Sequence, residues 1–208
     1  MTILITGADG YLGWPTSLRI ASRTDDRVVL VDNFGRREWV SEVGSVSATP
    51  VADIETRLEA AEEVHGLTNL SFVEGDLTDR AFVDELLQVH EPDTIVHTAA
   101  QPSAPYSQIN GERANFTQHN NMQATRNLAF GLEENGLSDT HLIETTTTGV
   151  YGAPEFPIPE GGATMENQGE SDDVPFPAMA GSWYHLTKSH DAANLRLAHK
   201  QFDIPVSD

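Results

Sequence analysis

Tyr184 and Lys188 are the residues whose types and spacing most directly suggest chemistry. On a helix, side chains four positions apart lie on one face, so the Lys188 ammonium can stabilise a Tyr184 phenolate beside it. A free tyrosine has a pKa of about 10, and lowering it by ~3 units needs roughly 4 kcal/mol of preferential phenolate stabilisation. The chain contains only two lysines, but tyrosine and lysine also meet at this spacing on many surface helices. The pair predicts a general base and needs support from the rest of the chain.

A glycine-rich turn near the N-terminus predicts where a cofactor would bind. Residues 2–6 form a short apolar run, Gly7, Gly10 and Gly13 follow at once, and a helical pattern covers 11–23. This order of strand, turn and helix is typical of dinucleotide sites, because the glycines allow a tight turn, close approach of the phosphates and close helix packing. The helix N-terminus would then face the pyrophosphate anion.

The end of the next predicted strand, 27–32, bears on the choice of dinucleotide. Asp32 lies where a carboxylate would bind the adenosine ribose hydroxyls, which favours NAD as the cofactor. Arg36 and Arg37 follow closely and could instead receive the 2′-phosphate of NADP. The sequence therefore favours NAD and leaves NADP as the alternative.

The length and composition predict a globular protein with one substantial core. The chain has 208 residues, of which 38% are hydrophobic, and no apolar run is long enough to cross a membrane. The glycine turn begins at Gly7, so we expect no signal peptide and a cytoplasmic location. The absence of cysteine excludes disulfides and thiolate metal sites, and the eight histidines show no ligand spacing, so no metal site is predicted.

The formal net charge of −20 arises from 32 acidic and 12 basic residues spread over most of the chain. Nucleic acid is excluded as a partner on this balance, because no basic surface would neutralise phosphates. Two lysines beside ten arginines and abundant acids resemble the proteins of halophilic organisms. The alternative is a low-salt protein with an acidic face for a basic partner.

Strand and helix patterns alternate along the chain, which predicts an α/β fold with a doubly wound parallel sheet. The expected strands are 2–6, 27–32, 69–74, 94–98 and 141–146, and the expected helices are 11–23, 52–64, 79–89, 112–134 and 181–201. Residues 1–208 would form one NAD-binding Rossmann domain that ends near the start of a sixth strand at 203–206. Residues 152–181 are rich in Pro, Gly and acids, so we expect a long loop near the active site.

Several short motifs together resemble a known family. They are the glycine turn, Asp32, Gly75-Asp76-Leu77, His97-Thr98-Ala99-Ala100, Ser103-Ala104-Pro105-Tyr106-Ser107, Thr117-Gln118-His119-Asn120-Asn121, Thr147 ahead of Tyr151-Gly152, and Tyr184 to Asp191. The chain is similar to the extended short-chain dehydrogenases/reductases of the NAD-dependent epimerase/dehydratase type. Within them it most resembles the branch that joins sulfite to UDP-glucose.

The resemblance implies roles for individual residues. Tyr184 would remove the proton of the sugar 4-hydroxyl, Lys188 would lower the pKa of Tyr184 and hold the nicotinamide ribose, and Thr147 would orient the same hydroxyl. His185 matches a histidine proposed for the dehydration or sulfite step, and Gln101 would contact the substrate. The cofactor contacts implied are Gly7, Asp9, Gly10, Tyr11, Leu12, Gly13, Asp32, Asn33, Arg36, Asp76, Leu77 and Asn121, with Tyr184 and Lys188.

The resemblance also implies a reaction and an assembly. Hydride passes to NAD, the 4-keto sugar loses its C5 proton and water leaves from C6. Sulfite then adds to the alkene, and the hydride returns. UDP-glucose or a related nucleotide sugar would be the substrate, and the helices at 112–134 and 181–201 would pair across a homodimer.

Two departures keep alternatives open. Pro102 stands where the sulfite branch carries an arginine, which favours another nucleotide-sugar 4-epimerase or dehydratase. Family members also continue for roughly as many residues again, so we expect the smaller substrate domain to be largely absent. The third hypothesis is accordingly a truncated NAD-binding module without catalytic activity.

The halophile hypothesis predicts that salt stabilises the fold. Raising KCl from about 0.1 M to about 1 M shortens the Debye length from about 10 Å to about 3 Å, which screens repulsion among surface acids. The midpoint of thermal unfolding, followed by circular dichroism, should rise over this range. Unfolding at molar salt, with greater stability at low salt, would reject the hypothesis.

Overall fold

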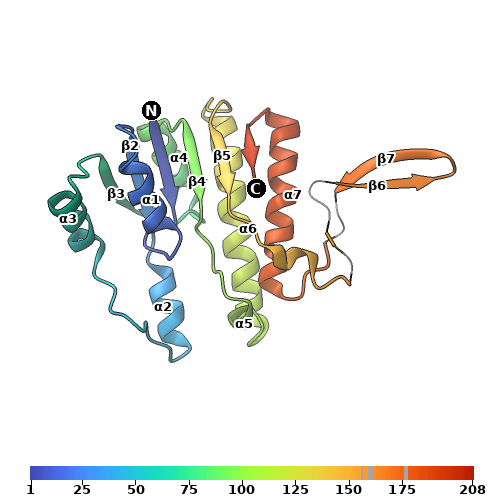
Figure 1. The fold of residues 1–208 in the computed structure, drawn as a ribbon, viewed down its shortest axis with the longest axis horizontal. Coiled ribbons are helices and arrows are strands. Elements are labelled where there is room, and N and C mark those ends of the chain that lie inside the picture. The colour runs from blue at the N-terminus through green and yellow to red at the C-terminus, as the bar shows by residue number, and fades with distance from the viewer. Residues whose placement is uncertain (156, 159–161, 176–177) are drawn as a thin grey trace.

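Six parallel strands form the central sheet of the computed structural model, which describes residues 1–155, 157–158, 162–175 and 178–208 (Figure 1). The strands are β1 (Thr2–Thr6), β2 (Arg27–Asp32), β3 (Leu70–Glu74), β4 (Thr94–His97), β5 (His141–Glu144) and β8 (Val206–Ser207). Their spatial order is β3-β2-β1-β4-β5-β8, with every neighbouring pair parallel. The order in which successive strands are added across the sheet reverses between β1 and β4, which is where doubly wound sheets bind ligands.

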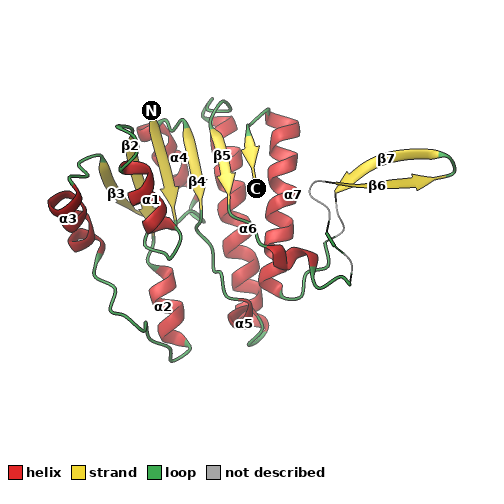
Figure 2. Cartoon of the chain, viewed as in Figure 1, coloured by secondary structure: helices red, strands yellow, loops and turns green. Residues whose placement is uncertain are grey.

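Helices connect the strands and flank the sheet (Figure 2). They are α1 (Gly13–Ala21), α2 (Gly35–Glu42), α3 (Ile54–His65), α4 (Arg80–His90), α5 (Ala104–Ser107), α6 (Gly111–Glu134), α7 (Trp183–Phe202) and the 3₁₀ turn η1 (Thr148–Tyr151). Polar side chains fix several helix starts by accepting backbone N–H bonds of the first turn, namely Asp53, Asp79, Asn110 and Ser182. The expected doubly wound α/β fold is confirmed.

The core consists of two layers, one on each face of the sheet. Alternate strand residues such as Leu4, Val29 and Leu142 pack against α4, α6 and α7, whereas Ile5, Val28 and Leu30 pack against α1 and α3. Burial on both faces explains why the strands are continuous apolar runs. In the described part of the chain, no helix is long and apolar enough to cross a membrane.

The segment 152–181 differs from the expected loop, because it contains an antiparallel hairpin that projects away from the sheet (Figure 1). Strands β6 (Gly162–Asn167) and β7 (Glu170–Pro175) are joined by Gln168 and Gly169, both with positive φ, as a two-residue hairpin turn requires. Neither strand has a buried face, so the sequence lacks the apolar alternation that predicts strands. Residues 156, 159–161 and 176–177 of this segment lie outside the described residues.

Candidate active site

In the glycine turn between β1 and α1, backbone atoms lie so close together that they leave little or no room for side chains. Gly7 has φ +71°, and a Cβ there would lie 2.7 Å from the Ala99 backbone nitrogen. A Cβ on Gly13 would lie 2.2 Å from the Gly7 carbonyl oxygen, and one on Gly10 would lie 3.0 Å from it. Side chains other than hydrogen therefore do not fit at Gly7 and Gly13, and the backbone is bare where a pyrophosphate would approach.

Asp32 lies at the carboxyl end of β2, beside this turn. Its carboxylate accepts hydrogen bonds from the backbone N–H groups of Asp9 at 2.9 Å and Phe34 at 2.7 Å. Burial raises the pKa of Asp32, and these two hydrogen bonds oppose that rise. Each oxygen keeps lone pairs to accept further bonds, so the group suits the two hydroxyls of a ribose.

The side chain of Asp9 binds arginines and is 8% exposed. Arg37 makes two hydrogen bonds of 2.7 Å to the Asp9 carboxylate, and Arg57 makes one of 2.8 Å. The Arg57 guanidinium also lies 4.1 Å from the centre of the Trp14 ring. Arg37 is thus already paired with a carboxylate, which weakens the alternative that it receives the 2′-phosphate of NADP.

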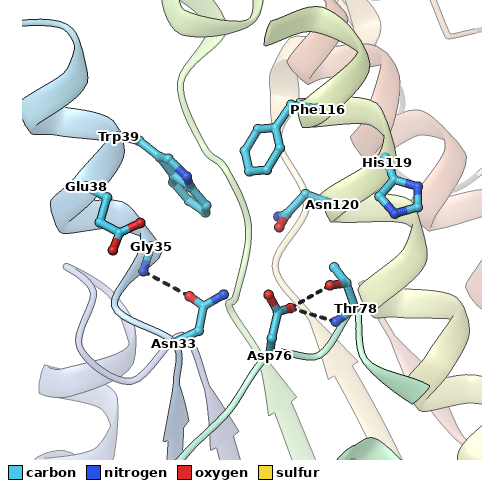
Figure 3. Close-up of a pocket in the computed structure, with 9 residues that line it drawn as sticks. All are labelled: Asn33, Gly35, Glu38, Trp39, Asp76, Thr78, Phe116, His119 and Asn120. Atoms are coloured by element: carbon cyan, nitrogen blue, oxygen red, sulfur yellow. Dashed lines mark hydrogen bonds between the residues drawn. The ribbon is translucent and has the colours of Figure 1, made fainter. Parts of the chain in front are cut away.

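A pocket of about 290 Å³ opens beside Asp32 at the ends of β2 and β3 (Figure 3). The predicted residues Asn33 and Asp76 lie at its base, and the rings of Trp39 and Phe116 meet edge to face at 5.4 Å above them. The size and the aromatic walls suit a purine ring. Trp39 and Phe116 belong to no motif, so the sequence did not identify them. Leu77, predicted as a cofactor contact, packs in the core.

Two serines fix Tyr184 at the start of α7. The Ser182 hydroxyl accepts the backbone N–H of His185 at 3.1 Å, and the Ser107 hydroxyl of α5 accepts that of Tyr184, also at 3.1 Å. The Ser103-to-Ser107 motif therefore positions the predicted base through the backbone. Tyr184 is half-buried, and Lys188 lies one helical turn further in and is buried.

The turn η1 brings Thr147 to the same place. Thr147 Oγ1 accepts the backbone N–H of Gly149 at 3.2 Å, which leaves its own hydroxyl hydrogen available to donate. A Cβ on Gly149 would lie 2.4 Å from His185 Nε2, so the histidine ring rests directly on this turn. The rings of Tyr184 and His185 are 5.3 Å apart. Thr147, Tyr184 and His185 thus lie on neighbouring pieces of chain, as a shared site requires.

The surroundings of Lys188 differ from the expectation. Its ammonium donates a hydrogen bond to Glu144 and lies 3.1 Å from Asp191 Oδ2. Burial raises the pKa of Tyr184; Lys188 opposes this, whereas Asp191 and Glu144 add to it. Lys188 therefore acts on the Tyr184 pKa in the predicted direction, but burial and the two carboxylates leave that pKa raised. In the sequence, Glu144 is an acid that directly follows the apolar pair Leu142 and Ile143 of this strand.

Asn121 and Gln101 connect the elements around the site. Asn121 accepts the backbone N–H of Gln101 at 2.8 Å and donates to Thr187 on α7 at 3.0 Å. The Gln101 side chain is buried and accepts the backbone N–H of Ser103 at 2.8 Å. These bonds give both residues a role in holding α6 and α7 together, and their contacts to cofactor and substrate stay predictions. Within the described residues, no cluster of His, Asp or Glu could hold a metal ion.

The comparison with protein families agrees with this geometry. The sequence model of the NAD dependent epimerase/dehydratase family matches residues 3–204. The chain belongs to this family. Its glycine turn, Asp32 and the Tyr184–Lys188 helix occupy the carboxyl edge of the sheet that members of a doubly wound fold use for ligands.

Individual relatives in the family cover nearly all of this chain. UDP-sulfoquinovose synthase of the Spinacia oleracea chloroplast is 38% identical over 206 residues, which span 99% of this chain and 42% of the relative. The synthase of Sulfolobus acidocaldarius is 38% identical over 211 residues, which span 100% of this chain and 52% of the relative. The chain therefore spans about half the length of these two relatives.

One solved structure of the family shows a similar fold with ligands. The UDP-glucuronic acid 4-epimerase of Bacillus cereus, in complex with UDP-glucuronic acid and NAD, superposes with a TM-score of 0.68 at 25% identity. The match covers 99% of this chain and 55% of that one.

The close approach of Gly13 to Gly7 predicts the effect of adding one methyl group. Gly13→Ala should reduce the free energy of unfolding by about 1–3 kcal/mol, because backbone atoms must move to accept the Cβ. Gly111→Ala is the matched control, since Gly111 also opens a helix and has no atom within 4 Å of the added carbon. Urea unfolding of both variants measures the difference. Equal stability of the two proteins would contradict the packing argument.

Proposed function

We propose that this chain carries the cofactor and the general base of an NAD-dependent nucleotide-sugar enzyme, and that its reaction is the one named for UDP-sulfoquinovose synthase. UDP-glucose and sulfite would be the substrates. The observation that carries the proposal is the 38% identity to two such synthases over at least 99% of the chain. The geometry around Tyr184 supports the same conclusion.

The described residues fit NAD. The bare backbone at Gly10 and Gly13 would face the pyrophosphate, Asp32 would accept the ribose hydroxyls, and the Trp39–Phe116 pocket would hold the adenine. Pairing of Arg37 with Asp9 favours NAD over NADP. When bound, the cofactor would accept and later return the hydride of the sugar C4 carbon.

The residues around Tyr184 have the donors and acceptors for the proton transfers. Tyr184 would take the proton of the sugar 4-hydroxyl, and Thr147 would donate a hydrogen bond to the same oxygen. Lys188 would hold the nicotinamide ribose and supply positive charge to the phenolate. His185, which rests on Gly149 beside Tyr184, would serve the later dehydration or sulfite step.

A second pocket, of about 320 Å³, is lined by a cation that would bind an anionic substrate. Arg36 lines it together with Gln101, Ser103 and Tyr106, and the charge of Arg36 also acts on Tyr184. Arg36 would therefore supply a cation for sulfite or a substrate phosphate, a role that Pro102 cannot fill.

Pro102 favours one competing function. An enzyme that exchanges configuration at C4, or removes water without adding sulfite, needs Tyr184, Thr147 and NAD but no sulfite site. A nucleotide-sugar 4-epimerase or dehydratase is therefore the second candidate.

The assembly and the location form part of the proposal. Helices α6 and α7 pack side by side and would pair with their copies in a homodimer, which a molar mass from light scattering would test. The cytoplasm, where NAD and nucleotide sugars occur together, would be the location.

The reaction is tested by its product. Incubation of the protein with NAD, UDP-glucose and sulfite should give a sulfonated nucleotide sugar in the mass spectrum. A changed configuration at C4 without sulfite incorporation would identify the epimerase alternative. Binding of NAD without turnover of any nucleotide sugar would reject both.

The role of Tyr184 is tested by removing only its hydroxyl. Tyr184→Phe should lower the rate of cofactor reduction by UDP-glucose about 100-fold or more, because the base is lost, while calorimetry finds nearly unchanged affinity for NAD. Trp183→Phe, at the exposed neighbouring position, is the control and should keep its rate. Unchanged turnover in Tyr184→Phe would mean that another residue is the base.

A further inference from the structure

A buried charged cluster lies one helical turn from Tyr184. It consists of Glu144 at the carboxyl end of β5 and of Lys188 and Asp191 on α7, whose side chains are 0%, 4% and 1% exposed. Lys188 donates a hydrogen bond to Glu144, and Lys188 Nζ lies 3.1 Å from Asp191 Oδ2. Burial opposes the charge of Lys188, but the two carboxylates outweigh it and raise the Lys188 pKa. The ammonium is therefore charged at neutral pH and lies between two acids.

The cluster contains two carboxyl groups, Glu144 and Asp191, but only one cation, Lys188. His97, the nearest basic group on β4, is neutral because burial and the charge of Lys188 lower its pKa to about 3. Neither oxygen of Asp191 accepts a well-oriented hydrogen bond from the described residues. Two ionised carboxylates would leave an uncompensated buried charge, which is costly. Burial raises the pKa of Asp191; Lys188 opposes this rise and Glu144 adds to it.

The cluster acts on Tyr184 from two elements. Lys188 and Asp191 act on it from α7 and Glu144 from β5, and Arg36 on α2 adds a smaller positive contribution. Thr125 of α6 contacts both Glu144 oxygens at 3.4 Å and contributes no charge. The two carboxylates thus offset the stabilisation that the Lys188 ammonium would give to a Tyr184 phenolate.

We propose that Glu144 and Asp191 are positioning residues for the Tyr184 base: they hold the Lys188 ammonium in place and offset its charge, so that all three residues together set how readily the phenol ionises. The inference rests on the proposed role of Tyr184. The proposed coupling between the charges of this cluster and the ionisation of Tyr184 is electrostatic, and it can be measured without substrate.

The coupling is tested by titrating Tyr184 in the whole protein. Ultraviolet difference absorbance reports tyrosine ionisation, and the same titration in a Tyr184→Phe background identifies the contribution of Tyr184 among the four tyrosines. In Glu144→Gln, which keeps the side-chain shape, Tyr184 should ionise about one pH unit lower or more. Asp191 also raises the Tyr184 pKa, so Glu144→Gln combined with Asp191→Asn should give the larger shift.

Glu134→Gln is the matched control, because Glu134 pairs with Arg80 on the surface and should leave the Tyr184 titration unchanged. If Glu144→Gln does not fold by circular dichroism, Asp191→Asn alone decides and should shift the titration in the same direction. An unchanged titration in the folded variants, or an equal shift in Glu134→Gln, would overturn the inference. A shifted titration in a protein that turns over no nucleotide sugar would support the inference and reject the proposed function.

Discussion

The buried ion pair between Glu144 and Lys188 is the interaction on which the arrangement of the site depends. It joins the end of β5 to the second turn of α7, the helix that carries Tyr184 and His185. A buried ion pair repays the cost of removing both charges from water only when its geometry is good, yet removing one partner typically costs about 3–5 kcal/mol. The pair is thus a weak source of net stability and a strong constraint on where α7 lies, which is what a site of fixed geometry needs.

The parallel sheet supplies the second constraint, because it places the ends of distant segments at one edge. Thr6 is in register with Val31 and His97, and His97 is in register with Glu144. Gly7, Asp32 and Glu144 therefore emerge at the same edge although more than a hundred residues separate the first from the last. The strand register thus brings the cofactor turn and the start of the base helix to the same edge of the sheet.

The sequence predicted the sheet, its five longest strands and the principal helices, because apolar runs buried on both faces and glycine turns are local signals. It also placed Thr147, Tyr184, His185 and Lys188 on elements that do meet. It did not predict how Lys188 is paired, since the partner Glu144 is far away in sequence and became a neighbour only through the packing of α7 on β5. The β6–β7 hairpin was missed for a different reason: with both faces exposed, its strands carry acids at positions where buried strands carry apolar side chains.

The scarcity of lysine in this chain raises the question of why position 188 is a lysine and not an arginine. Arginine outnumbers lysine ten to two in this chain, so a cation that served only for charge would usually be an arginine here. A guanidinium is planar and larger than an ammonium, and it needs partners for five N–H groups. The space between Glu144, Asp191 and neutral His97 offers two acceptors in a fully buried position. An ammonium brings three N–H donors into this space and a guanidinium would bring five, so lysine leaves fewer buried donors unpaired, and the site favours lysine against the composition of the rest of the chain.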